Sequence, residues 1–138
     1  APALLAAAMA EALPDEVDGL VVNMVDQRVK RLTPNFFSYT LSKSALWTAT
    51  QTMALAYAPK IRVNAIGPGP TLKSSRQSDT EFARQVEALT LEHGPELGEF
   101  GATIRYFWDN RSITGQMIAL DGGQHLAWET PDVTGVQE

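Results

Sequence analysis

A short run of mostly apolar residues, Leu20 to Val25, places the strongest constraint on how this chain folds. Gly19 precedes the run and Asp26 ends it. The run is continuously apolar rather than alternating, which suits a strand that is buried on both faces, as in a parallel sheet. We therefore expect a strand at 20–25 with Asp26 at its carboxyl end.

Turn residues and helical spacing predict most of the other elements. Pro2 suits the first turn of a helix, and Leu5, Met9 and Leu13 recur at four-residue intervals as an apolar stripe. The remaining expected segments are a strand at 60–66, helices near 80–89 and 95–108, a strand at 116–120 and a loose tail at 127–138.

Tyr39 and Lys43 lie four residues apart, where Ser38 is the expected cap of a long helix that ends before Pro59. Residues at this spacing share one face of a helix, so a phenol and an ammonium would lie side by side. The phenol of an isolated tyrosine has a pKa of about 10, and a nearby cation lowers that pKa. The pair is a candidate acid-base catalyst, beside the simpler interpretation of a half-buried ring next to a solvated amine.

Asp26 is also placed for chemistry, because ligands of open α/β sheets collect at the carboxyl ends of the strands. The simpler interpretation is that Asp26 caps a turn or pairs with Arg28. After the second expected strand, the segment from Gly67 to Thr71 is too rich in glycine and proline to continue regular structure.

Three motifs in order carry a family resemblance. They are Asn23-Met24-Val25-Asp26 before the Tyr-x-x-x-Lys pair, Gly67-Pro68-Gly69-Pro70-Thr71 after the second strand, and Leu120-Asp121-Gly122-Gly123-Gln124-His125-Leu126 near the end. The set resembles the C-terminal half of a short-chain dehydrogenase/reductase, up to about Leu126. The aspartate at position 26, where this family usually has a serine, is similar to the pteridine reductase and dihydromonapterin reductase branch.

The resemblance implies a Rossmann-like α/β domain over residues 1–126, with a doubly wound parallel sheet, and a C-terminal tail at 127–138. It also implies that the N-terminal half of the family fold is missing from this sequence, with the glycine-rich turn that receives the cofactor's pyrophosphate. The segment Gly67-Pro68-Gly69 lacks the third glycine of that fingerprint and does not replace it. An inactive fragment or an assembly subunit is therefore an alternative to an active enzyme.

By resemblance, the activity is an NADPH-dependent reduction of a pterin-like C=N bond, with NADH left open as the cofactor. Tyr39 would donate the proton, Lys43 would lower its pKa and hold the nicotinamide ribose, and Asp26 would replace the serine. An ionised carboxylate only accepts hydrogen bonds, which suits a substrate with N–H groups such as a pterin. A ketone, a sugar or an acyl thioester is the alternative substrate. The expected cofactor-binding residues are Met24, Val25, Tyr39, Lys43, Pro68, Gly69, Thr71 and Leu72.

Residues 73–93 are polar and charged, and the resemblance implies that they form a mobile substrate lid. Arg76 and Arg84 are candidates in this lid to meet an anionic substrate. The commoner role of such arginines is that of solvated surface side chains.

Composition limits the partners. Eleven basic and sixteen acidic side chains give a net charge of −5, which argues against nucleic-acid binding. The chain has no cysteine, and His93 and His125 lie far apart without a ligand pattern, so no metal is expected. No apolar stretch approaches the roughly twenty residues that span a bilayer. We expect a cytoplasmic enzyme for a small-molecule substrate, and the resemblance adds a homo-oligomer, a tetramer or a dimer.

Overall fold

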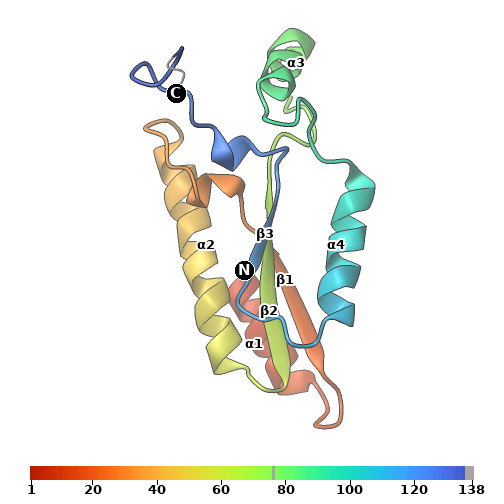
Figure 1. Cartoon of the computed structure of the whole chain (residues 1–138). Coiled ribbons are helices and arrows are strands. Elements are labelled where there is room, and N and C mark those ends of the chain that lie inside the picture. Colours follow the sequence, from red (N-terminus) through yellow and green to blue (C-terminus); the bar gives the residue numbers. More distant parts are fainter. Residues whose placement is uncertain (76, 136–138) are drawn as a thin grey trace.

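In the computed structural model, which describes residues 1–75 and 77–135, three parallel strands form one sheet with the order β1-β2-β3. The strands are β1 (Gly19–Met24), β2 (Ile61–Pro68) and β3 (Met117–Leu120). The helices are α1 (Pro2–Ala12), α2 (Phe37–Ala56), α3 (Asp79–Glu87) and α4 (Leu97–Asp109), and two short 3₁₀ turns are η1 (Gln27–Val29) and η2 (Gln124–Leu126). The predicted parallel α/β fold is confirmed (Figure 1).

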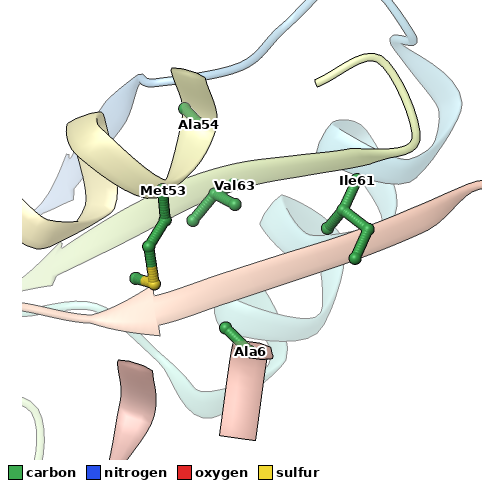
Figure 2. Close-up of a cluster of buried hydrophobic side chains, with 5 residues drawn as sticks. All are labelled: Ala6, Met53, Ala54, Ile61 and Val63. Carbon is green, nitrogen blue, oxygen red and sulfur yellow. The ribbon is translucent and has the colours of Figure 1, made fainter. Parts of the chain in front are cut away.

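Helices lie on both sides of the sheet, with α2 on one side and α4 on the other (Figure 1). The core on the α2 side is formed by Ala6 from α1, Met53 and Ala54 from α2, and Ile61 and Val63 from β2 (Figure 2). Ile61 and Val63 are two positions apart and therefore face the same side of the sheet. This arrangement agrees with the doubly wound pattern that was expected.

The predicted apolar stripe of α1 is partly wrong. Met9 and Leu13 pack against the core, but Leu5 is 71% exposed and the neighbouring Ala6 is buried instead. The residues that contact the core, Ala6, Met9, Ala10 and Leu13, recur at the i, i+3, i+4 and i+7 spacing of one helical face. Because an α-helix has 3.6 residues per turn, residues spaced strictly by four rotate gradually around the helix. The four-residue pattern therefore included Leu5, which lies off the buried face.

The predicted cap of α2 is also wrong. The helix begins at Phe37, and its N-cap is Phe36, which has the left-handed backbone angles φ 60 and ψ 42. The Thr40 amide donates to the Phe36 carbonyl at 2.9 Å, so the first helical turn already closes at Phe36. Ser38 therefore lies inside that turn, where its side chain does not cap the helix.

Two buried asparagines tie the strands to neighbouring segments. Asn23 Nδ2 donates to Thr50 Oγ1 at 2.9 Å, which links β1 to α2. Asn64 Nδ2 donates to the Ile113 carbonyl at 3.0 Å, and Asn64 Oδ1 accepts from the Gln116 amide at 3.0 Å. Because buried polar groups require such partners, these bonds hold α2 and the approach to β3 in place around β2.

All three strands run in one direction, so their carboxyl ends meet at the same end of the sheet. The start of α2, the segment that leads to α3, and η2 gather at that end (Figure 1). No helix in the described part of the chain is both long enough and apolar enough to cross a membrane.

Candidate active site

Asp26 directly follows β1, and both of its carboxylate oxygens are engaged. Oδ1 accepts from the Arg28 backbone amide at 2.8 Å and so caps η1. Oδ2 accepts from the Tyr39 hydroxyl at 2.8 Å. The capping role and the catalytic placement, which the sequence left as alternatives, are thus compatible in one side chain.

Tyr39 and Lys43 lie on the same face of α2, as their spacing predicts. Lys43 Nζ is 5.7 Å from the centroid of the Tyr39 ring and donates to the Met24 carbonyl at 2.9 Å. Both residues of the pair therefore bond to the carboxyl end of β1, Tyr39 through Asp26 and Lys43 through Met24. A carboxylate, a phenol and an ammonium meet at the point where a parallel sheet receives its ligands.

The pKa of Tyr39 is raised to about 12. Partial burial of the phenol contributes most, and the hydrogen bond to Asp26 and the negative charge of Asp26 act in the same direction, whereas the charge of Arg28 lowers the pKa. The expectation that Lys43 lowers this pKa is therefore wrong for this state of the chain. The nearest charge that acts on the phenol is a hydrogen-bonded carboxylate, so Tyr39 is a protonated donor at neutral pH.

An open cleft of about 870 Å³ lies over these residues. Most of the predicted site residues meet in its wall: Met24, Asp26, Tyr39, Pro68, Gly69, Thr71 and Leu72. The described lining does not include Val25, which is 2% exposed, or Lys43, which lies one helical turn after Tyr39 on α2. The cleft is within the size range of small-molecule sites, about 300–1,000 Å³.

The remaining walls of the cleft come from residues that were not named individually as site residues. They are formed by Arg28 and Phe36 near the start of α2, by Gln77, Phe82 and Gln85 in or near α3, by Leu97 and Phe100 from α4, by Gln124 from η2, and by Pro70 and Ser74. Several lie in segments that the sequence had marked: Ser74, Gln77, Phe82 and Gln85 belong to the predicted lid at 73–93, and Gln124 belongs to the motif from Leu120 to Leu126. Arg28 follows Asp26 by two residues, which was a further signal.

Of the two arginines that were considered for an anionic substrate, only Arg84 can be placed relative to this site. Arg76 lies outside the described residues, and the exposed Arg84 on α3 does not line the cleft.

Gly69 lies where the backbone after β2 packs against the end of β3. Its amide donates to the Leu120 carbonyl at 2.8 Å, and an added Cβ would lie 2.6 Å from Asp121 Cα. Glycine thus allows the segment after β2 to lie directly against the end of β3. The same segment, from Pro68 to Leu72, lines the cleft.

Gly69→Ala should therefore lower the free energy of unfolding by about 1–3 kcal/mol, because the methyl group meets backbone that cannot move aside cheaply. Urea denaturation of the natural full-length protein measures the effect. Gly98→Ala in α4 is the matched control: its Cβ meets nothing within 4 Å, and it should leave stability unchanged or raise it. A Gly69→Ala protein as stable as the wild type would contradict the close packing at Asp121.

Within residues 1–75 and 77–135, no three His, Cys, Asp or Glu side chains lie together as metal ligands would. The pair formed by His125 Nδ1 and Asp121 Oδ2, at 2.7 Å, belongs to the turn at η2.

A family model described as enoyl-(acyl carrier protein) reductase matches residues 1–125 of the chain. The chain belongs to the short-chain dehydrogenase/reductase family. The dihydromonapterin reductase of Klebsiella pneumoniae subsp. pneumoniae is 32% identical over 108 residues, which cover 77% of this chain and 44% of that protein. The predicted resemblance to the dihydromonapterin reductase branch of the family is thereby confirmed.

Solved structures of short-chain dehydrogenases/reductases show the same architecture. The FolM alternative dihydrofolate reductase 1 from Brucella suis, in complex with NADP, is 70% identical with a TM-score of 0.93 and covers 95% of this chain and 53% of that chain. The promiscuous reductase LugOII, which catalyses a keto-reduction, is 26% identical with a TM-score of 0.80, over 92% of this chain and 52% of that chain. The chain spans about half the length of the relatives that it matches.

Proposed function

We propose that the protein is an NADPH-dependent reductase that reduces a C=N bond of a pterin-like substrate. The observation that carries this proposal is the 2.8 Å hydrogen bond from the Tyr39 hydroxyl to the Asp26 carboxylate at the mouth of the cleft. A serine at position 26 could donate or accept, whereas a carboxylate only accepts and so favours a substrate rich in N–H groups. NADPH is the proposed cofactor because the similar FolM enzyme from Brucella suis is described in complex with NADP.

The residues at the end of β2 fit the nicotinamide end of such a cofactor. Pro68, Gly69, Thr71 and Leu72 line the same cleft as Tyr39, and Gly69 would let the backbone lie close to a flat ring. Lys43, one helical turn after Tyr39 on α2, would hold the ribose hydroxyls. When bound, the nicotinamide supplies the hydride for the reduction.

Tyr39 supplies the proton in this scheme. Its raised pKa keeps the hydroxyl protonated at neutral pH, so the phenol can donate to the substrate nitrogen. Asp26 accepts from the substrate's N–H groups and orients the ring for that transfer. Lys43 donates to the Met24 carbonyl at 2.9 Å and so holds the end of β1 beside Tyr39 in this scheme.

The proposed partners are a small-molecule substrate and further copies of the same chain. Helices α1 and α2 pack on the same side of the sheet. Both expose large apolar side chains, Leu4 and Leu5 on α1 and Leu41 and Leu55 on α2. Exposed apolar surface of this kind supports a homo-oligomer.

The test is a comparison of substrates with the natural full-length protein and NADPH. We expect a dihydropterin to be reduced with a higher kcat/KM than a simple ketone, because Asp26 can pair only with the N–H-bearing substrate. NADPH oxidation, followed by its absorbance, measures both rates. Preference for the ketone would instead support the alternative that LugOII illustrates, a keto-reductase on the same fold.

A further inference from the structure

Arg28 places a cation in the cleft that the proposed chemistry does not use. Among the described residues that line the cleft, only Asp26 and Arg28 carry a charge. The two oxygens of Asp26 are bonded to the Arg28 amide and to the Tyr39 hydroxyl. Within residues 1–75 and 77–135, the guanidinium of Arg28 forms no hydrogen bond or ion pair; it lies over the ring of Phe36, and its charge acts on Tyr39.

The guanidinium is held over an aromatic ring. Its central carbon lies 4.3 Å from the centroid of the Phe36 ring, and the Arg28 backbone is fixed by its amide bond to Asp26. Phe36 has the left-handed angle φ 60, which is uncommon for a residue other than glycine. Strained backbone of this kind persists where surrounding structure holds it and is often found at ligand sites.

The ring of Phe36 is not a conventional hydrogen-bond acceptor, so the guanidinium that lies over it keeps its N–H groups available for a planar anion. Arginine binds carboxylates through two parallel hydrogen bonds, and the stack restricts its rotation beforehand. The half-buried position of Arg28 strengthens such a pair relative to one in open water.

The rest of the cleft suits a substrate longer than a bare pterin. Phe82 from α3 and Leu97 and Phe100 from α4 provide apolar walls for an aromatic linker. We propose that Arg28, stacked on Phe36, is a carboxylate-binding subsite that makes the enzyme select pterins with an acidic tail over pterins with a neutral tail. This inference rests on the proposed pterin reductase function.

The test uses Arg28→Gln in the natural full-length protein with NADPH and two substrates. Dihydrofolate carries a benzoyl-glutamate tail, and dihydromonapterin carries a neutral polyhydroxyl tail. The KM for dihydrofolate should rise about 10- to 100-fold, the effect of losing hydrogen bonds to a charged group, while the KM for dihydromonapterin and for NADPH should stay close to the wild-type values. Arg31→Gln is the matched control, since Arg31 is exposed and does not line the cleft.

A second readout separates a charge interaction from a structural role. Added salt should raise the wild-type KM for dihydrofolate and should have little effect on that of Arg28→Gln. Arg28→Lys keeps the charge without the planar fork, so it should restore the affinity only in part.

Three outcomes would overturn the inference. Equal loss for both pterins would mean that Arg28 holds the ring or the local fold. A rise in the KM for NADPH alone would assign the guanidinium to a cofactor phosphate. A wild-type enzyme that reduces neither pterin would remove the proposed function, and the selectivity with it.

Discussion

Tyr39→Phe should lower kcat/KM for dihydropterin reduction by about 10²- to 10⁴-fold, the usual contribution of a positioned general acid. The substitution removes only the hydroxyl, which donates to Asp26 at 2.8 Å and is the proposed proton source. Steady-state kinetics with the natural full-length protein and NADPH measure the effect. The ring remains in place, so the cleft should keep its shape and NADPH should still bind.

Tyr106→Phe is the matched control for this substitution. Tyr106 lies on α4, is 50% exposed and does not line the cleft, so its variant should retain full activity. Fluorescence titration with NADPH separates loss of catalysis from loss of binding. A Tyr39→Phe enzyme with near wild-type kcat/KM would show that the proton comes from elsewhere, and the proposed mechanism would fail.

Asp26→Ser should lower kcat/KM for a dihydropterin by about 10- to 100-fold, because hydrogen bonds to a charged group each contribute about 1.5–3 kcal/mol. A serine hydroxyl restores the residue that the family usually has but removes the charge. We expect a smaller loss, or none, with a ketone substrate, since a ketone has no N–H group to pair with the carboxylate. Parallel assays of both substrates measure this change in preference.

The same variant should change the pH dependence. Two of the causes that raise the pKa of Tyr39 to about 12, the hydrogen bond to Asp26 and its charge, disappear, whereas the lowering effect of Arg28 remains. The pKa of Tyr39 therefore falls, and the alkaline loss of activity, which follows deprotonation of the donor, moves to lower pH. Asp109→Ser, at an exposed position on α4, is the control and should change neither the preference nor the pH profile. Full dihydropterin reduction by Asp26→Ser would contradict the role of the carboxylate.

Local patterns predicted much of the fold and part of the site. The apolar run before Asp26 predicted a buried parallel strand, and β1 pairs with β2 over Gly19 to Met24. The four-residue spacing of Tyr39 and Lys43 predicted a shared helical face, which α2 provides. These predictions depend only on the periodicity of neighbouring residues, and tertiary packing does not alter that periodicity.

Predictions that depended on electrostatic balance were less reliable. Helical spacing placed Lys43 beside Tyr39 and so suggested a lowered pKa for the phenol. In the fold, Asp26 reaches Tyr39 from β1, and Lys43 donates instead to the Met24 carbonyl. The sign of a pKa shift depends on all groups near the phenol and on its burial, which come from several elements.

The amino-acid sequence by itself determined the strands, the order of the elements, the face shared by Tyr39 and Lys43, and the family. Tertiary structure decided which further side chains complete the cleft. Arg28 stacks on Phe36, and Gln124 comes from the far end of the chain to line the same cleft. The physical reason is that periodicity is a local property, whereas a cleft is formed where segments distant in sequence pack together at the end of the sheet.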